Sequence, residues 1–423
     1  MTRLHFLIKK TIKFLAIFAF FTTLFISCDL DSLLDEEDDE YFVSQPDARM
    51  IAGNLLFPER EPRDTTTLRL YIDDYTLTKD ISTINAIYAT QNDPVFYIIN
   101  YTGGGFVILA ADQRVEPVLA YSPTNEFILG EQSYPPGLVD WLEEYVSLII
   151  EVRRENLQPS ERIESMWRFL NAGRFNVDFL NILSCVEGEE EFIEKKILLD
   201  TKWGQGCGYN AALADSCTVR CDRPPVGCVA TAVAQILKYH ADDGWNGSYT
   251  MANGNPGPTL NWSGMPLTGV NENNHGHIHF LMAHLGPMLS MSYSCTGSGA
   301  SIDNALTTFT NNFSFSTAKK RSINSISDYS YVLSDIKKNR PVYMRGRETK
   351  TEENLEGEIK KTYSGHAWVA DGYSQLFICG EGFIANNYKI HMNWGWGGSN
   401  ADGFYLKKEG RFEENRQIIW DIR

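Results

Sequence analysis

The sequence predicts an α+β protein in which a domain with separate helical and β-sheet lobes follows a smaller α+β domain. In residues 197–423 helical patterns come first, and short strand-like runs such as HAWVADGY and KIHMNW come last. Further upstream, FYIINYTGGGFVILAAD alternates apolar and polar residues around a glycine turn, which predicts a hairpin. LVDWLEEYVSLIIEVRREN then places apolar residues at helical spacing. Helices and strands segregated in this way indicate an α+β fold and not a repeat architecture.

Composition limits the classes of function. The chain has 423 residues, of which 43% are hydrophobic and 22% charged, so two or three domains of ordinary size are expected. The formal net charge of -16 argues against a nucleic-acid partner, because neutralising phosphates requires clustered Lys and Arg. No GxxxxGK[ST] or GxGxxG pattern stands between a strand and a helix, so nucleotide binding has no support.

The first 27 residues have the pattern of a signal peptide. Four basic residues precede an apolar stretch over residues 14–26, which is too short to span a bilayer. The following FISC resembles a bacterial lipoprotein signal, in which Cys28 would be acylated, although Phe25 stands where Leu is usual. An ordinary secretory signal with a chance cysteine is the alternative. We expect an exported protein, held at the outer membrane through a lipid on Cys28.

Residues 28–43 are expected to form an acidic linker behind the lipidated cysteine. They include DLDSLLDEEDDE, and a block of like charges of this kind stays solvated. A simple spacer is one interpretation of this segment. The other is a signal for export to the cell surface, which acidic tracts resemble in some outer-membrane lipoproteins.

Two domains are expected after the linker, over residues 44–190 and 191–423. The helical pattern of the first domain continues through IESMWRFLNAG. The charged segment VEGEEEFIEKK, residues 186–196, separates the two domains. Its Glu run and Lys pair predict an exposed, cleavable linker.

Seven cysteines remain when Cys28 is set aside, and an odd number in an exported protein suggests one unpaired thiol. Cys207, Cys217 and Cys221 are close enough in sequence for one local disulfide. No pair of CxxC motifs supports a zinc site. HGHIH at residues 275–279 suggests a metal site. The apolar helix pattern that follows it instead favours a polar segment leading into a helix. We therefore expect no metal site.

Cys228 opens a predicted buried helix in PPVGCVATAVAQILKYH. Backbone N–H groups lack partners in the first turn of a helix and the helix dipole is positive there, which predicts a lowered pKa for the thiol. Gly227 removes side-chain bulk, so that a substrate backbone could approach. A buried structural cysteine and a nucleophile are both compatible with this pattern.

A nucleophilic cysteine needs a base, and the base needs an orienting group. His366 in SGHAWVADGY and His391 in KIHMNWGWGG are both candidate bases. The separations of 138 residues from Cys228 to His366 and 165 to Asn393 are close to those of papain-like Cys-His-Asn enzymes. Because His391 and Asn393 would share one strand face, His391 remains a rival at this point.

Several motifs together resemble the streptopain family of secreted, papain-fold cysteine peptidases. The peptidase domain is matched by LLDTKWGQGCGYN, GCVATAVAQILKYH, SGHAWVADGY and NWGWGGSNADGFY. Residues 95–150, including TGGGFVILAADQRVEPVLAYS, resemble the inhibitory propeptide of that family. The resemblance implies a papain-like, two-lobed peptidase domain, with a helical lobe and an antiparallel sheet lobe, preceded by an inhibitory α+β prodomain.

Roles for four polar residues follow from the resemblance. Cys228 resembles the nucleophile and His366 the general base. Gln205 corresponds to the side-chain donor of the oxyanion hole, with the backbone N–H of Cys228 as the second donor. Asn393 matches the residue that orients the imidazole, which leaves His391 as a strand residue outside the site. If Cys207 paired with Cys228, the enzyme would be inactive until it was reduced.

Four further residues are expected to support the site or contact substrate: Gly227, Gly365, Trp394 and Trp396. The two indoles resemble those that shield the catalytic pair from water, and simple core packing is compatible with the same role.

The resemblance implies an endopeptidase made as a zymogen, acting on proteins or peptides through a thioester and favouring an apolar residue at the second position before the cut. No cofactor is required. The enzyme's own propeptide would inhibit it until cleavage near residues 186–197. Two rival functions use the same fold: a papain-fold acyltransferase or amidase, and a surface binding protein without activity.

Overall fold

The computed structural model describes residues 39–59, 61, 66–90, 93–130, 134–171, 175–177, 192–218, 221–353, 359–377, 383–398, 401–407 and 416–423. The predicted signal peptide, Cys28 and most of the acidic linker lie outside these residues, as do Cys185 and Cys379. Within the described part, no helix is both long and apolar enough to cross a membrane.

The first domain contains the predicted hairpin and both predicted helices. The hairpin is antiparallel, with Phe96 opposite Ala110. Its turn requires glycine, because a Cβ on Gly104, where φ is +94°, would lie 2.5 Å from the carbonyl oxygen of Thr124. The elements are α2 (Gln45–Gly53), β1 (Leu55–Pro58), β2 (Leu68–Leu70), β3 (Tyr75–Leu77), β4 (Ile81–Thr90), β5 (Asp93–Tyr101), β6 (Phe106–Ala110), β7 (Val118–Ser122), α3 (Pro136–Arg154), α4 (Glu161–Asn171) and β8 (Phe175–Asn176).

The second domain has its longer helices first and most of its strands last, as predicted. Every residue of α5 from Cys228 to Tyr239 is buried, which fits its apolar and alanine-rich sequence. The elements are β9 (Phe192–Ile197), α5 (Cys228–Asp242), α6 (Ile278–Met288), α7 (Ile302–Thr307), β10 (Lys319–Ile323), α8 (Tyr329–Lys337), β11 (Val342–Glu353), β12 (Ile359–Phe377), β13 (Phe383–Asn393), β14 (Gly403–Leu406) and β15 (Arg416–Trp420).

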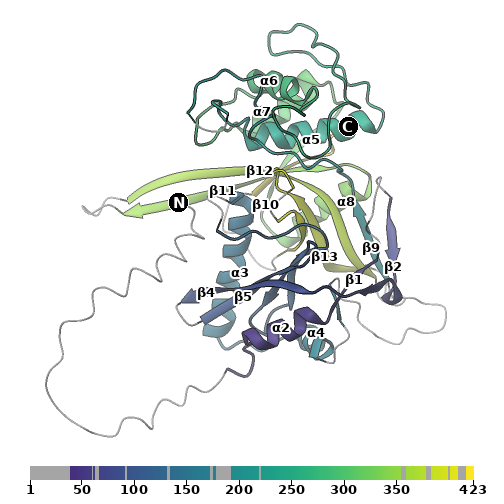
Figure 1. Ribbon diagram of the computed structural model, residues 1–423, viewed down its shortest axis with the longest axis vertical. Coiled ribbons are helices and arrows are strands. Elements are labelled where there is room, and N and C mark those ends of the chain that lie inside the picture. The colour runs from purple at the N-terminus through teal and green to yellow at the C-terminus, as the bar shows by residue number, and fades with distance from the viewer. Residues whose placement is uncertain are drawn as a thin grey trace, which may run out of the picture.

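One sheet joins the two domains. Its strand order is β10-β15-β11-β12-β13-β14-β7-β6-β5-β4, so the four strands of the first domain continue the sheet of the second. The junction is the antiparallel pair β14–β7, with Phe404 opposite Tyr121. A second junction pairs β2 with β9, placing Leu68 opposite Lys195. Helices α5, α6 and α7 gather on one side of β11 and β12, and α3, β4 and β5 lie on the other (Figure 1).

The prediction of an exposed linker over residues 186–196 is wrong for its described end. Residues 192–197 form β9, which pairs with β12 and β2. Lys195 is fully buried: its Nζ lies 2.9 Å from a carboxylate oxygen of Glu61 and 4.4 Å from the centre of the Phe404 ring. The Glu and Lys residues of this segment suggested a solvated chain, but strands on both edges of β9 and a carboxylate from the first domain bury it. Residues 186–191 lie outside the described ranges.

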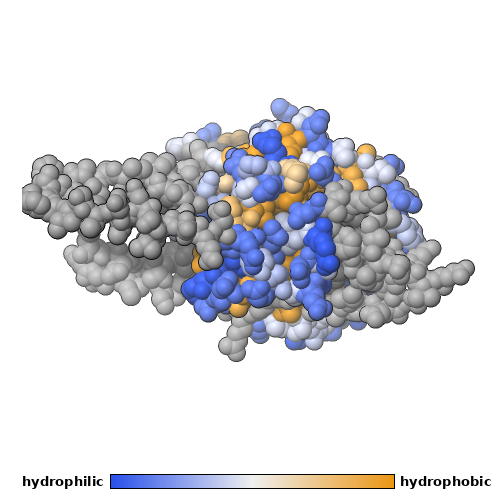
Figure 2. All heavy atoms as spheres, turned by 90° about the horizontal axis from the view of Figure 1, so that it is seen from below, coloured by the Kyte–Doolittle hydropathy of each residue, from blue (hydrophilic) through white to orange (hydrophobic). Residues whose placement is uncertain are grey.

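A single hydrophobic core runs through both domains. Fully buried aromatic residues come from the first domain, such as Tyr97 and Phe106, and from the second, such as Trp203 and Tyr343. Seen from the side of α2 and α4, the coloured residues are mostly hydrophilic, with apolar ones gathered in the upper middle of the view (Figure 2). The two domains therefore pack as one body and bury a continuous interface.

Candidate active site

Cys228 is the first residue of α5, as the sequence predicts, and it is buried and unpaired. The residue before it, Gly227, has φ +90°, a conformation that favours glycine. A Cβ on Gly227 would lie 2.7 Å from the carbonyl oxygen of Ser298 and 3.1 Å from Sδ of Met291. The space that this glycine leaves is therefore filled by a loop of the protein itself. This corrects the expectation that the space admits a substrate backbone.

A cleft of about 340 Å³ opens at the start of α5. Cys228 lines it from the helix, and His366 lines it from β12. The other lining residues are Val229, Gly299, Ala300, Ser301, Arg345, Gly365 and Ala367. The structure thus brings Cys228, His366 and Gly365 to one cleft, although 138 residues separate the thiol from the imidazole in the sequence.

His366 is held in place by main-chain and aromatic contacts. Its Nε2 lies 2.9 Å from the carbonyl oxygen of Trp394, which can only accept, so Nε2 carries the proton. Its ring stacks on Trp368, with centroids 6.1 Å apart and planes at 15°. The ring of Trp396 meets the imidazole edge to face, with centroids 6.4 Å apart and planes at 73°. Of the two predicted indoles, Trp396 therefore contacts the imidazole, whereas Trp394 contributes its carbonyl oxygen and packs its indole against Trp368, with centroids 5.2 Å apart.

Asn393 makes its side-chain hydrogen bonds to groups other than His366. Its Oδ1 accepts hydrogen bonds from Gln235 and from the backbone N–H of Gly395. Its Nδ2 donates to the carbonyl oxygen of Thr201 at 2.8 Å. Its Nδ2 also donates to Oε1 of Gln235 at 3.2 Å, so these partners occupy the whole amide. The carbonyl oxygen of Trp394, and not Asn393, accepts the hydrogen bond of the imidazole.

Gln205 lies near the nucleophile because its carbonyl oxygen accepts a hydrogen bond from the backbone N–H of Val226, at 3.0 Å. Two disulfides hold this region. One joins Cys207 to Cys221, which confirms a local bridge and rules out pairing of Cys207 with Cys228. The other joins Cys217 to Cys295, next to the loop that forms one wall of the cleft.

The pKa of the Cys228 thiol is raised, which corrects the prediction of a lowered value. Burial is the largest cause, because it disfavours the thiolate. The backbone N–H groups of Ala367, Val229 and Cys228 and the charge of Arg345 act in the opposite direction without reversing it. Burial also lowers the pKa of His366 to about 4. In this conformation the pair is therefore a neutral thiol and a neutral imidazole.

Acidification should destabilise the full-length chain through His366. Because burial lowers its pKa to about 4 in the folded state, the unfolded state takes up a proton first as the pH falls below about 6.5, and stability is lost between these values. A His366→Gln variant lacks this titration. We expect the stability of the wild type relative to this variant to fall by roughly 3 kcal/mol from pH 7 to pH 4, measured by urea unfolding at each pH.

The same comparison removes the effect of other buried groups. Burial raises the pKa of Asp402 to about 6, so this carboxyl has the opposite influence on stability, and it is present in both proteins. A difference between wild type and variant that stays constant from pH 7 to pH 4 would contradict the prediction.

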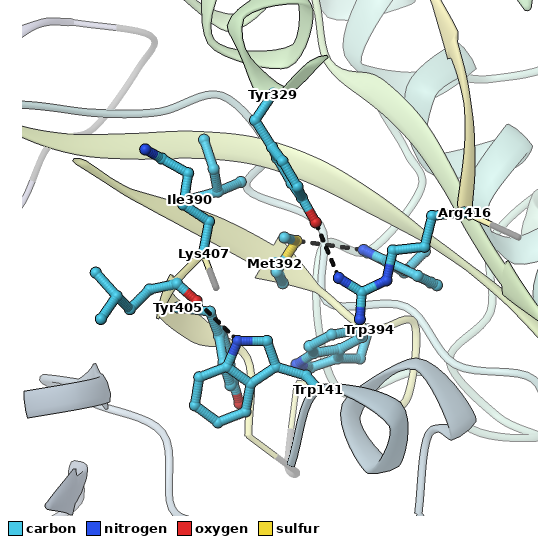
Figure 3. A pocket seen from close by; sticks show the side chains of 10 residues that line it. Trp141, Tyr329, Ile390, Met392, Trp394, Tyr405, Lys407 and Arg416 are labelled. Carbon is cyan, nitrogen blue, oxygen red and sulfur yellow. Dashed lines mark hydrogen bonds between the residues drawn. The ribbon is translucent and has the colours of Figure 1, made fainter. Parts of the chain in front are cut away.

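Helix α3 of the first domain packs against Trp368 and Trp394, the two tryptophans that hold His366. A Cβ on Gly137 would lie 2.7 Å from the ring of Trp368 and 3.0 Å from that of Trp394, so this close approach requires glycine. One turn later, Trp141 contacts Tyr405 edge to face and donates to the carbonyl oxygen of Leu406 at 2.8 Å. Figure 3 shows Trp141 beside Trp394 and Tyr405 in this buried pocket.

A buried ion pair closes the same interface. Arg416 on β15 contacts Glu144 on α3 at 2.7 Å, and its side chain is 6% exposed. The guanidinium also donates to the hydroxyl oxygen of Tyr329 at 3.0 Å, as Figure 3 shows. At this interface α3 thus contributes the carboxylate of Glu144 and the indole of Trp141.

His391 lies on β13, where its Nδ1 is 2.6 Å from a carboxylate oxygen of Asp371, and it is not among the residues that line the cleft. His277 directly precedes α6 without a capping hydrogen bond from its side chain, and its Nδ1 accepts from the backbone N–H of Asn261. Within the described ranges, the residues grouped closely enough to suggest a metal are Cys207, Cys221 and Glu272. The two sulfurs of that group form a disulfide.

Sequence reasoning missed four residues that matter here: Trp368, Gln235, Arg345 and Arg416. Trp368 could have been found, because it follows His366 by two positions on a strand and so shares its face. Gln235 is seven residues after Cys228 on one helix, close to two full turns, which is a weaker signal. Arg345 and Arg416 depend on strand pairing, which the sequence does not reveal.

Comparisons with known proteins agree with this arrangement. A model of the Peptidase C10 family matches residues 203–405, and a model described as Spi protease inhibitor matches residues 41–149. Streptopain from Streptococcus pyogenes is 27% identical over 344 residues, covering 73% of this chain and 73% of that protein. These matches cover the two domains that the structure joins through one sheet.

Two more distant similarities extend the comparison. A thiol protease/hemagglutinin from Porphyromonas gingivalis is 25% identical over 337 residues, 75% of this chain and 34% of that protein. The chain thus spans about a third of that relative's length. A solved fragment of prointerpain A from Prevotella intermedia is 23% identical, with a TM-score of 0.51 over 80% of this chain and 97% of the fragment. This similarity concerns the fold alone.

Proposed function

Because this chain belongs to the Peptidase C10 family, the streptopain family of cysteine peptidases, we propose that it is the zymogen of an exported endopeptidase with Cys228 as nucleophile and His366 as general base. The observation that carries the proposal is their meeting in one cleft, at the start of a buried helix. We further propose that α5–α7 and the β11–β13 sheet correspond to the helical and sheet lobes of a papain-like domain.

The tautomer of His366 supports its role as a base. Its Nε2–H donates to the carbonyl oxygen of Trp394, which leaves Nδ1 with a free lone pair. During acylation Nδ1 takes the proton of the Cys228 thiol, and the thiolate attacks the carbonyl carbon of a peptide bond. In this mechanism the carbonyl of Trp394 orients the imidazole, a role that the orienting group of a catalytic triad usually fills.

The oxyanion that forms would accept hydrogen bonds from the backbone N–H of Cys228 and from the side chain of Gln205. Each donor contributes on the order of 3 kcal/mol to transition-state stabilisation. The imidazolium then protonates the leaving amine, and a water molecule activated by His366 hydrolyses the thioester. Asn393 acts indirectly: through its bonds to Thr201 and Gly395 it positions the carbonyl of Trp394.

The first domain acts as the inhibitory propeptide in this proposal. Its helix α3 packs on the tryptophans that support His366, and the active pair is neutral in this conformation. Cleavage would fall in residues 178–191, between β8 and β9. A lipid on Cys28 would stay with the prodomain, so processing would yield a catalytic fragment of roughly 25 kDa without the anchor.

Incubating the purified full-length chain with casein under mild reduction tests the proposal. We expect loss of the prodomain and cleavage of casein, and prior alkylation with iodoacetamide should prevent both, because Cys228 is the free cysteine among those described. Casein cleavage that continues at the same rate after complete alkylation of Cys228 would refute the proposed chemistry. Transfer to added amines without net hydrolysis would favour an acyltransferase.

A further inference from the structure

Arg345 places a positive charge in the active-site cleft. It lies on β11, directly beside the strand that carries His366, and it lines the cleft together with Cys228. Its Nη2 is 3.7 Å, and its Nε 3.8 Å, from the place where a Cβ on Gly365 would be. The guanidinium is therefore close to the reacting pair and reaches the space that a substrate must occupy.

The charge of Arg345 has no counterion among the residues that the structure describes, and no hydrogen bond to its guanidinium is found there. Other arginines of low exposure are each paired with a carboxylate, namely Arg114, Arg153, Arg340 and Arg416. Leaving a half-buried guanidinium unpaired is unfavourable unless a partner arrives from outside. The exception, Arg345, therefore lies in the cleft that holds Cys228 and His366.

Among its described residues, the prodomain supplies no partner for Arg345. Successive residues of a strand point to opposite faces, and the next residue, Gly346, faces α3: a Cβ there would lie 3.2 Å from Oδ2 of Asp140. Arg345 accordingly points to the other face, toward α5 and Cys228. On α3, Glu144 forms the ion pair with Arg416 and Asp140 lies on the face of β11 opposite Arg345.

The opposite wall of the cleft is small and uncharged. It is formed by Gly299, Ala300 and Ser301, and these residues leave room for a substrate side chain without competing for the guanidinium. The titratable groups on the near side, Cys228 and His366, are neutral in this conformation. Arg345 is thus the single formal charge among the residues that line this cleft.

We propose that Arg345 makes this peptidase select substrates with an acidic side chain, Asp or Glu, one or two residues from the scissile bond. A planar guanidinium can bind a carboxylate through two parallel hydrogen bonds, and an extended chain rises about 3.3 Å per residue, which keeps these positions within one cleft. The inference rests on the proposed peptidase function and deepens it. It differs from the apolar preference that the family resemblance implies.

The test compares substrates that differ only in charge. A fluorogenic peptide set carries Glu or Gln at each of the two positions before and the two positions after the cut, and kcat/KM is measured with enzyme activated from the full-length chain. At one position we expect a Glu/Gln ratio of about ten or more, appearing mainly in KM and decreasing at high salt. Ratios near one at all four positions would overturn the proposal.

Variants then assign the preference to Arg345. Arg345→Gln should reduce the ratio to about one while Gln peptides are still cleaved, and Arg345→Lys should keep part of it. Arg321→Gln removes an arginine that is paired with Asp328 outside the cleft, so it should leave the ratio unchanged. Arg345→Glu should reverse the preference in favour of Lys at the same position.

Recognition of an acidic side chain can be distinguished from a purely electrostatic effect of Arg345 on the nucleophile. The charge of Arg345 also lowers the pKa of the Cys228 thiol. If this were its whole role, Arg345→Gln would reduce kcat/KM equally for Glu and Gln peptides. That result would refute the selection of acidic residues. If the wild type cleaves the Gln peptides without preferring Glu, the inference fails but the peptidase function stands. If it cleaves none of the peptides, the proposed function fails first.

Discussion

Replacing Cys228 with alanine is expected to lower kcat/KM for a peptide substrate by a factor of about 10⁴ or more. The thiol lines the cleft together with His366, and removal of a catalytic nucleophile costs losses of this order or larger. The variant chain incubated alone should also keep its prodomain. Its activity is measured after a tagged wild-type enzyme has removed the prodomain and has itself been withdrawn.

A fold control and a second variant make this prediction specific. Cys228→Ala exchanges one small buried side chain for another, so the urea midpoint of the full-length chain should change little. His366→Ala should also lose most activity, and the double variant should be scarcely worse than either single one, because nucleophile and base act as a unit. Additive losses, or a Cys228→Ala enzyme with near wild-type rates, would mean that this pair does not carry the reaction.

Replacing Glu144 with alanine is expected to destabilise the zymogen by about 3–5 kcal/mol, because the charge of Arg416 would remain buried without its carboxylate. The effect should disappear once the prodomain has been removed, since Glu144 leaves with it. It should appear in urea unfolding of the full-length chain. It should also appear as faster loss of the cleaved prodomain during gel filtration.

Matched variants separate the ion pair from a general effect on α3. Glu151→Ala removes an exposed carboxylate from the same helix and should change stability by less than about 0.5 kcal/mol. Replacing both partners, as in Glu144→Leu with Arg416→Met, should recover most of the loss, because an apolar pair of similar size leaves no buried charge. If Glu144→Ala behaves like Glu151→Ala, this ion pair does not hold the prodomain.

The two strand junctions between the domains also bear on how the prodomain is released after cleavage. The prodomain adds β7 to β14 and β2 to β9, and a cut between β8 and β9 removes no residue of either pair, so we expect both to persist. Cleavage alone therefore leaves the prodomain bound by main-chain hydrogen bonds, the ion pair and the contacts of Trp141. Activation of the proposed enzyme then requires dissociation or further digestion of the prodomain, and weakening the ion pair should accelerate that step.

Most helices and strands could be predicted because their signals are local. Apolar spacing and a glycine turn were sufficient for β5, β6, α3, α5 and α6, and for the strands that carry His366 and Asn393. The residues 192–196 were mistaken for an exposed linker because a charged composition normally indicates solvent. Their burial depends on strands and on Glu61, which lie far away in the sequence.

The sequence by itself determined the chemical groups of this protein: a thiol at a helix start, a histidine in a strand, and motifs that resemble one family of peptidases. Only the tertiary structure decided the protonation state of the thiol and the imidazole. Burial makes the thiol and imidazole neutral, because removing water disfavours charge more than the helix start favours it. Strand pairing, which local patterns do not encode, decided that Trp394 holds His366 and that Arg345 enters the cleft unpaired.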